Sequence, residues 1–167
     1  MTTTTRAVVV AEHGGPEVLR VHQVPEPSPG PGQVRIVTAV TSVNFADVHA
    51  RRGGYAAAEP PPFIPGLDCV GTIDVLGEGV TGLTVGQRVC AWTDGGSYAE
   101  EVLANATLTY PLEEGVPVEA AASLTVLVTA HNVLERGQVE AGDVVLVHAA
   151  TGGIGAAAVQ MAVARGA

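Results

Sequence analysis

A glycine-rich turn near the end of the chain carries the clearest chemical signal in the sequence. Residues 150–155 read Ala-Thr-Gly-Gly-Ile-Gly, after the apolar run 144–149 and before an alanine-rich run. Set on the pattern G-x-G-x-x-G, Ala150 takes the first place, Gly152 the second and Gly155 the third. A side chain at the second place would hold a diphosphate away from the backbone, and one at the third would push the helix off the strand. The turn therefore favours a dinucleotide site at a helix N-terminus.

The neighbours of this turn separate the dinucleotide interpretation from its alternatives. A lone glycine pattern is weak, but an apolar strand before it and a helix after it are its expected context. A plain tight turn between strand and helix remains the alternative. A Walker phosphate loop is excluded, since no Lys-Ser/Thr pair follows the glycines. The predicted cofactor-binding residues of the turn are Ala150, Thr151, Gly152, Gly153, Ile154 and Gly155.

The elements that position this turn differ between the two parts of the chain, with strands predicted first and mostly helices after them. Residues 1 to about 112 are valine-rich segments broken by Gly and Pro, which favour a small barrel or folded sheet. The predicted strands are 6–12, 18–27, 34–44, 69–77, 87–92, 98–105 and 107–112. A short helix is expected over 45–54. Beyond Pro117 we predict a helix over 118–137, a turn and a buried strand over 139–150, and a helix over 153–165 capped by Gly166.

Composition narrows the class of partner and the compartment. The formal net charge is −9, which argues against nucleic acid and anionic membranes, because phosphate binding draws on clustered Lys and Arg. Two cysteines, Cys69 and Cys90, stand in apolar runs and are expected to be buried free thiols, which suits a reducing cytoplasm. No signal peptide pattern stands at the start, and no apolar run approaches the ~20 residues that span a bilayer. We expect a soluble, cytoplasmic protein.

Several motifs in order resemble the medium-chain dehydrogenase/reductase family, and within it the zinc-free quinone oxidoreductase branch. The matching segments are GGPEVLRV, PGPGQVRIVTAVTSVNFADVHARRGGY, PPFIPGLDCVGTIDVLGEGVTGLTVGQRV, GGSYAEEV, EAAASL, VTAHNVL and GDVVLVHAATGGIGAAAVQMA. The resemblance covers essentially all 167 residues. It implies a mixed β and α/β fold: a GroES-like β-barrel domain over 1–122, then over 123–167 a connecting helix and the first β-α unit of a Rossmann domain.

The family contains zinc-dependent and zinc-free enzymes, and two positions of this sequence distinguish between them. Zinc alcohol dehydrogenases have C-x-T-D-x-H at the first helix and P-G-H-E a little later. Here Asn44 stands in place of the cysteine and Leu67 in place of the histidine. Leucine has no donor atom and an isolated carboxamide is a poor zinc ligand. The four-cysteine lobe is also absent, and the five histidines lack ligand spacing, so we expect no metal.

The resemblance then implies an activity and a set of residues. Without a Lewis acid, a quinone or enone is an easier hydride acceptor than an alcohol is a donor, which matches NADPH-dependent quinone or enone reductases. Asn44, Asp47 and Tyr55 are implied beside the nicotinamide and the substrate, and Thr129 near the cofactor. Each has a structural alternative: Asn44 as a helix N-cap, Asp47 at the first helical turn, Tyr55 in packing, Thr129 as an ordinary helix residue.

Three further residues qualify what the resemblance implies. His49 matches a proton-relay position of the zinc enzymes, but without zinc a solvated or hydrogen-bonded helix histidine is the better interpretation. Val126 and Leu127 stand where the family often has an Asn-Tyr pair, which removes a polar contact from the expected cleft.

The residue that distinguishes NADPH from NADH lies about 20 residues past the glycine turn, beyond residue 167. NADPH is therefore expected from the resemblance alone, and NADH is not excluded. We expect the 167 residues to be an N-terminal portion that binds NADPH weakly and could pair as a homodimer or with a complementing fragment. The alternatives are a catalytically inactive remnant or interaction module with a GroES-like fold, and a relative of zinc alcohol dehydrogenases.

Overall fold

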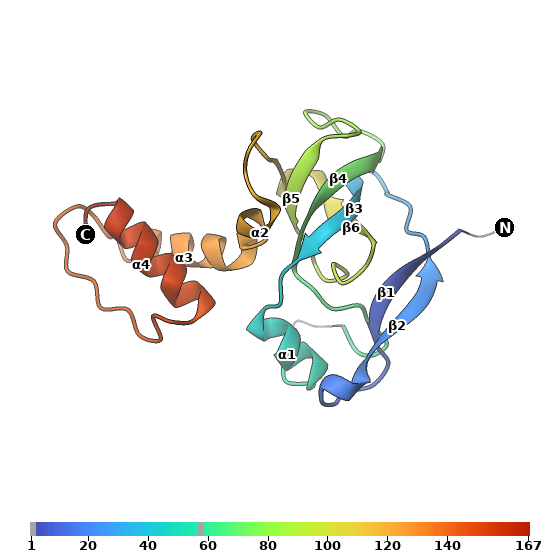
Figure 1. Ribbon diagram of the computed structural model, residues 1–167, viewed down its shortest axis with the longest axis horizontal. Coiled ribbons are helices and arrows are strands. Elements are labelled where there is room, and N and C mark those ends of the chain that lie inside the picture. The colour runs from blue at the N-terminus through green and yellow to red at the C-terminus, as the bar shows by residue number, and fades with distance from the viewer. Residues whose placement is uncertain (1–2, 57–58) are drawn as a thin grey trace. The chain divides into compact units, whose positions relative to one another are not determined.

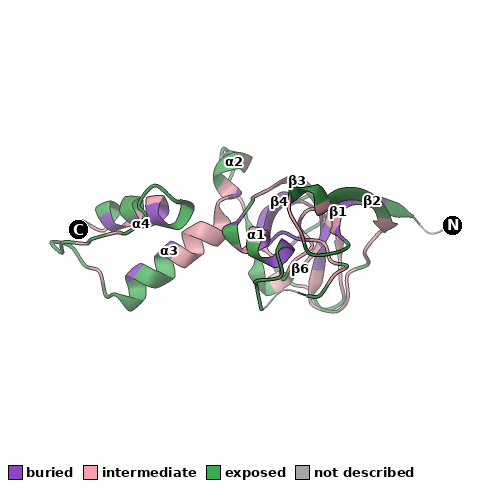
Figure 2. Ribbon diagram, turned by 90° about the horizontal axis from the view of Figure 1, so that it is seen from below, coloured by how far each residue is buried: buried purple, intermediate pink, exposed green. Residues whose placement is uncertain are grey.

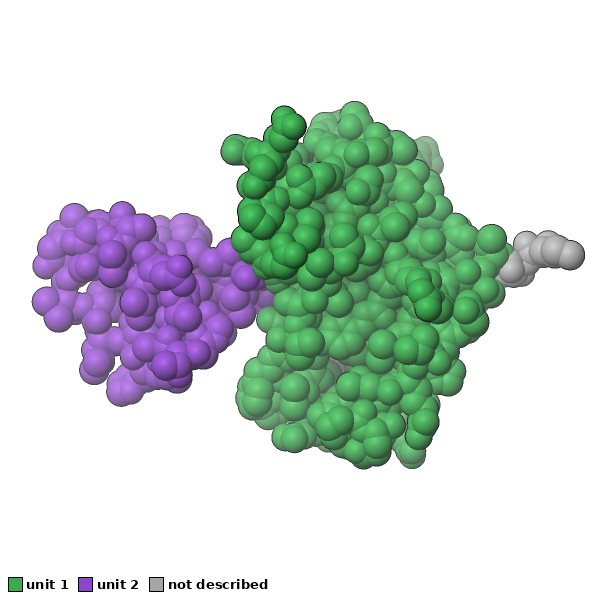
Figure 3. All heavy atoms as spheres, viewed as in Figure 1, with its two compact units in different colours: residues 1–122 green, residues 123–167 purple. Residues whose placement is uncertain are grey.

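The computed structural model describes residues 3–56 and 59–167, and the chain divides into two compact units, 1–122 and 123–167 (Figure 3). The first unit consists of strands and a few short helices, and the described elements of the second are helices. In chain order they are β1 (Thr4–Val10), β2 (Leu19–Pro25), β3 (Gln33–Thr41), α1 (Phe45–Arg51), β4 (Asp68–Leu76), β5 (Arg88–Trp92), β6 (Glu101–Asn105), β7 (Thr109–Pro111), α2 (Val118–Ala121), α3 (Leu124–Arg136) and α4 (Gly153–Ala164). Short 3-10 turns precede β2 (Pro16–Val18) and β7 (Ala106–Leu108).

The first unit is a curled antiparallel sheet with a hairpin beside it (Figure 1). The sheet has the strand order β6-β3-β4-β5-β7, and β1 pairs with β2 in a separate two-stranded ladder. Two bridges, Ala7–Ala99 and Val10–Phe63, join β1 to the segments that flank the sheet. This arrangement confirms the folded, mostly β architecture that the valine-rich segments predicted.

Alternation along the central strands builds the core of this unit. Val34 and Ile36 of β3 point to the same face as Val102 and Ala104 of β6, because they are register partners. Facing them from β4 and β5 are buried residues of the same cluster, which Figure 2 colours purple with the rest of the buried set: Cys69, Ile73, Val89 and Ala91. Both cysteines are free and buried, as predicted.

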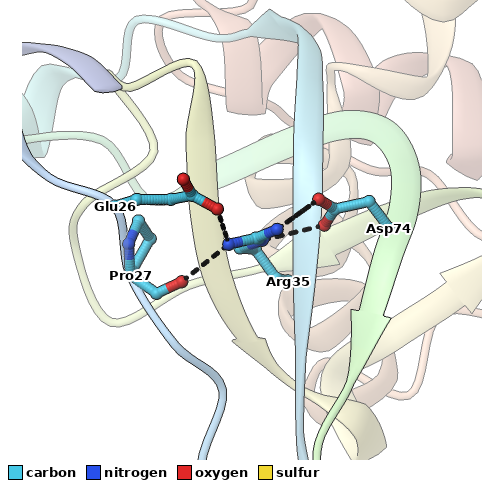
Figure 4. Close-up of polar contacts among 4 residues, drawn as sticks. All are labelled: Glu26, Pro27, Arg35 and Asp74. Atoms are coloured by element: carbon cyan, nitrogen blue, oxygen red, sulfur yellow. Dashed lines mark hydrogen bonds and ion pairs between the residues drawn. The ribbon is translucent and has the colours of Figure 1, made fainter. Parts of the chain in front are cut away.

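An arginine on β3 anchors residues 27–32, the proline-rich turn between β2 and β3, to the sheet (Figure 4). Arg35 donates to Asp74 on β4 through Nη2 at 2.7 Å and Nε at 3.0 Å. Its Nη1 also pairs with Glu26 and donates to the carbonyl oxygen of Pro27 at 3.2 Å. The hydrogen bond that Arg35 donates to Asp74 raises the pKa of this guanidinium, which stays charged. The cluster anchors the segment between β2 and β3.

The helices near the C-terminus depart from the sequence prediction in one place. The helix expected over 118–137 is two helices, α2 and α3, interrupted at Ala122 and Ser123. Both α3 and α4 end near the expected glycines, Gly137 and Gly166, and Gly166 has a φ of 88°. Ala130 on α3 and Ala157 and Ala158 on α4 form the small core between these two helices.

The strand predicted within 139–150 is wrong. Residues 143–147 adopt no strand and 148–150 form a turn. A β-strand exists only through hydrogen bonds with a neighbouring strand, and no described residue pairs with this segment. Two of its apolar side chains are left in solvent: Val144 is 100% exposed and Leu146 is 82% exposed. Val147 packs against the small core between α3 and α4. Among the described residues, no helix combines the length and the apolar character needed to cross a bilayer.

Candidate functional site

One end of the curled sheet gathers the polar residues that follow β3, precede β4 and follow β5. The register pairs Thr41 with Cys69 and Asp68 with Trp92, so the chain leaves β3 where it enters β4 and leaves β5. Thr41 donates to the carbonyl oxygen of Asp68 at 2.8 Å, and the hydroxyl of Ser97 lies 2.8 Å from Thr41 Oγ1. Segments more than 50 positions apart in sequence therefore meet at this end.

Asp47 is the hub of this end of the sheet. Its Oδ2 accepts from the backbone N–H of Asn44 at 2.7 Å and from the hydroxyl of Tyr98 at 3.1 Å. Its Oδ1 accepts from the backbone N–H of Gly66 at 3.1 Å. Burial raises the pKa of this carboxyl, and the three donors oppose that shift. The carboxylate thus joins the start of α1 to two distant segments, and each of its oxygens accepts at least one hydrogen bond.

Gly66 can make this contact only because it is a glycine. Its φ is 103°, a conformation that other residues rarely adopt. A Cβ at this position would lie 2.1 Å from Ser97 Oγ. The carbonyl oxygen of Gly66 also accepts from Thr93 Oγ1 at 3.2 Å, which fixes the peptide unit on both sides.

A second chain of hydrogen bonds holds Asn44. The Asn44 Nδ2 donates to Ser42 Oγ at 2.9 Å, and that hydroxyl in turn donates to the carboxylate of Asp68. Asn44 is the N-cap of α1 and is 7% exposed. The structure therefore confirms the N-cap role that the sequence offered as the alternative for Asn44. Sequence reasoning missed Ser42, Asp68 and Tyr98 as partners, because the contacts of Asp68 and Tyr98 join segments that are far apart in the sequence.

A cavity of about 440 Å³ opens beside this network, within the first unit. Asp47 and Tyr55, two of the three predicted catalytic residues, line it, whereas Asn44 does not. The walls are mostly apolar. The lining residues are Ala46, Asp47, Ala50, Tyr55, Glu59, Pro60, Pro62, Phe63, Ile64, Pro65, Gly66, Leu67, Asp94, Gly95 and Gly96.

Tyr55 is the hydroxyl-bearing side chain of the cavity lining, and it is open to a ligand. It is 40% exposed and makes no hydrogen bond with any residue that the structure describes. Its phenol hydroxyl can donate to an acceptor oxygen inside the cavity. Tyr98, by contrast, is committed to Asp47, and burial raises the pKa of its hydroxyl.

The two positions that would hold zinc do not fit a metal. The Asn44 amide group points its N–H at Ser42, and Leu67 adds an apolar wall to the cavity. Neither side chain can act as the thiolate or imidazole ligand that a tetrahedral zinc site requires. In the parts of the chain that the structure describes, no three His, Cys, Asp or Glu side chains converge.

The glycine turn lies in the second unit, where it begins α4. Ala150 to Ile154 are exposed, and Gly152 is the helix N-cap. The first backbone N–H groups of a helix have no partner within it, so they are available to a ligand. Gly155 is buried, and a Cβ there would lie 2.3 Å from the carbonyl oxygen of Ala149. A glycine is thus required where α4 packs closely against the turn that precedes it.

The remaining predicted positions have ordinary structural surroundings. Thr129 Oγ1 donates to the carbonyl oxygen of Thr125 at 2.7 Å, within α3. Val126 lies against the turn, since a Cβ on Gly153 would meet its Cγ1 at 3.0 Å. His49 is exposed on α1, and its ring centroid lies 4.5 Å from that of Phe45. Cofactor contact by Thr129 stays a prediction.

Comparison with known proteins gives consistent relatives. The family described as "Alcohol dehydrogenase GroES-like domain" matches residues 30–135. The human synaptic vesicle membrane protein VAT-1 homolog is 38% identical over 160 residues, which cover 93% of this chain and 41% of that protein. The rat quinone oxidoreductase is 38% identical over 165 residues, covering 96% of this chain and 50% of that protein.

A solved structure supports the same assignment. A mycobacterial protein complexed with NADPH has a TM-score of 0.91 and 40% identity, with 96% of this chain and 50% of that one covered. The chain thus spans about half the length of the relatives it matches, or less. With its curled GroES-like sheet and glycine turn, the chain belongs to the medium-chain dehydrogenase/reductase family and corresponds to the N-terminal part of the quinone oxidoreductase branch.

Proposed function

We propose that the protein containing these residues is a zinc-independent, NADPH-dependent reductase of conjugated carbonyl compounds such as quinones and enones. The observation that carries the proposal is the apolar cavity at the end of the sheet. It contains Tyr55 as a hydrogen-bond donor, and Leu67 stands where a metal ligand would be. Quinone oxidoreductase relatives support the reaction class.

The glycine turn suits the cofactor. Its exposed amides at the start of α4 can bind a diphosphate, and Gly155 lets the helix approach the turn closely. Bound NADPH would supply the hydride. NADPH is proposed over NADH because a similar solved structure is named as an NADPH complex. The residues of the turn then serve to bind and orient the cofactor.

The cavity suits the acceptor. Its apolar walls exclude water from a flat conjugated ring, and the Tyr55 hydroxyl can donate to the carbonyl oxygen on which negative charge develops. Asp47 has both oxygens occupied by three donors, so its role is to hold α1 and the Gly66 peptide at the wall. Asn44 is held by Ser42 and caps the same helix, which keeps the cavity wall in place.

The direct test is a steady-state assay of the full reading frame with NADPH, NADH and a panel of quinones and enones. We expect turnover with NADPH and a conjugated acceptor, and none with saturated ketones. Tyr55→Phe should lower kcat/KM by about tenfold or more, because it removes a donor to the developing oxyanion. Tyr110→Phe is the matched control, since Tyr110 is similarly exposed but lies on β7 outside the cavity.

Two results would count against the proposal. One is the absence of turnover with every acceptor, which would favour the interaction-module alternative. The other is equal loss of activity in Tyr55→Phe and Tyr110→Phe, which would separate the chemistry from this cavity.

A titration of the 167-residue chain with NADPH should give weak binding, because its described residues supply the diphosphate turn without a partner strand beside it.

A further inference from the structure

The acceptor cavity carries acidic side chains and no basic ones. Asp47, Glu59 and Asp94 are among its lining residues, and none of the lining residues that the structure describes is Lys, Arg or His. We propose that this cavity selects uncharged acceptors over anionic ones, and that Glu59 and Asp94 are the residues that impose the selection. The inference rests on the proposed function, because it names the class of acceptor that the same cavity takes.

The three carboxylates come from three segments and play different parts. Asp47 is buried and bound by three donors, so part of its charge is compensated by hydrogen bonds. Glu59 and Asp94 are exposed, and neither forms an ion pair with the described residues. Asp94 follows the end of β5, and Glu59 begins the proline-rich segment that leads to Gly66. The opening of the cavity therefore keeps two uncompensated negative charges.

No nearby cation of the lining offsets these charges. Arg51, on the same helix as Asp47, turns its guanidinium to the carbonyl oxygen of Gly14 at 3.1 Å and is itself buried. The rest of the wall is apolar, with residues such as Pro62, Phe63 and Leu67. An anionic substituent on the acceptor would thus lose hydration and meet like charges, without a partner to compensate either effect.

The size of the effect follows from the exposure of the two carboxylates. In water, a like charge at contact distance disfavours binding by about fivefold, and by less at longer range or higher salt. Two such charges predict a discrimination of about 5- to 25-fold between an anionic acceptor and an uncharged one of the same size. Because the charges are at the opening, the discrimination should fall as ionic strength rises.

The experiment uses a matched pair of acceptors with the full-length protein: 1,4-naphthoquinone carrying a 2-sulfonate, and the corresponding uncharged 2-sulfonamide. The measured quantity is the ratio of the two kcat/KM values at low and at high NaCl. In the double variant Glu59→Gln/Asp94→Asn, the ratio of sulfonate to sulfonamide should rise about tenfold at low salt. High salt should raise the ratio of the unmodified protein toward that of the variant.

The control variant is Glu113→Gln/Glu114→Gln. It changes the net charge by the same amount at exposed positions outside the cavity lining, and its ratio should match that of the unmodified protein. An equal rise in both double variants would overturn the inference, because net charge alone would then explain it. An unchanged ratio in Glu59→Gln/Asp94→Asn would overturn it as well.

A binding measurement separates this inference from the proposed function. If no acceptor is reduced, the proposed function fails, and the two compounds are titrated while the amide signals of Tyr55, Phe63, Leu67 and Gly95 are followed by NMR. Binding of the sulfonamide in preference to the sulfonate, lost in Glu59→Gln/Asp94→Asn, supports the selection. Equal binding of the two, or no binding of the sulfonamide, refutes it.

Discussion

The two units of the chain satisfy their backbone and apolar groups in different ways. In the first, five strands pair with one another, and the carboxylate of Asp47 finds three donors within the same unit. In the second, α3 and α4 share a small alanine core, and residues 143–147 have no strand partner among the described residues. The difference teaches that the cavity beside Asp47 is built by its own unit, whereas the glycine turn follows a segment that needs a neighbouring strand to become a strand itself.

The largest expected contrast is in hydrogen exchange. Amides in the middle of β4, such as Val70 and Ile73, should open only with the unfolding of their unit and exchange more than about 10⁴-fold more slowly than unprotected peptides. Amides of residues 144–147 should exchange within about tenfold of the unprotected rate. Exchange measured by NMR on the 167-residue chain checks this. Similar protection in both places would remove the contrast.

Thiol reactivity gives the next largest contrast. Burial raises the pKa of Cys69 from its usual 9.0 to about 12, so about a thousandfold less thiolate is present at pH 8. Burial also raises the pKa of Cys90. Both should react with a disulfide reagent only as the first unit unfolds. In the Val144→Cys variant, the added thiol should react at the rate of a small peptide; slow reaction there, or fast reaction at the native thiols, contradicts the comparison.

Truncation of a buried side chain in the first unit and of an exposed one in the second should differ by a few kcal/mol. Ile73→Ala removes a fully buried side chain from the sheet core and should lower the free energy of unfolding by about 2–5 kcal/mol. Val163→Ala, on an exposed face of α4, should change it by less than about 0.5 kcal/mol. Urea unfolding followed by Trp92 fluorescence and by helical circular dichroism measures both. A comparable loss in the two variants would mean that buried Ile73 contributes no more to stability than an exposed side chain of α4 does.

The smallest effect concerns the charge of Asp47. Burial makes its pKa in the folded protein higher than its ordinary value of 3.8. The folded state therefore binds the proton more tightly than the unfolded state, and this group makes the free energy of unfolding fall as pH rises from about 3.8 through the folded pKa. Above that pKa its contribution is constant. Subtracting the urea-derived values of Asp47→Asn from those of the unmodified protein at pH 4 and pH 7 should give a difference that favours the unmodified protein more at pH 4.

A matched comparison limits this prediction to Asp47. Glu113→Gln alters an exposed carboxylate outside the network and supplies the reference for general acid effects. A difference for Asp47→Asn that grows toward pH 7 would mean that the three donors lower the pKa more than burial raises it. It would also assign the carboxylate a stabilising charge at the end of the sheet.

Local patterns in the sequence predicted much of the fold. Valine-rich runs between Gly and Pro placed the strands, since strand propensity and turn residues act over a few positions. The glycine turn was also found, because its spacing reflects contacts within the turn itself, such as that of Gly155 with Ala149. The segment 144–149 was not predicted correctly, because strand formation depends on a partner and not on the apolar run alone.

The candidate site was predicted only in part for a similar reason. Family resemblance pointed to Asp47 and Tyr55, which line the cavity. The contact of Asp47 with Tyr98 joins residues 51 positions apart, and that of Ser42 with Asp68 joins residues 26 positions apart. Such pairs follow from the register of β3, β4 and β5, which no local pattern specifies. The charge of the cavity opening likewise appears only when Glu59 and Asp94 are brought together by the fold.

The most direct test of the account is NADPH consumption by the full reading frame with 1,4-naphthoquinone after exhaustive dialysis against a zinc chelator. Because Asn44 and Leu67 supply no metal ligand, the account predicts that the rate after dialysis equals the rate before it and that added zinc does not raise it. Loss of turnover on chelation, restored by zinc, would contradict the account.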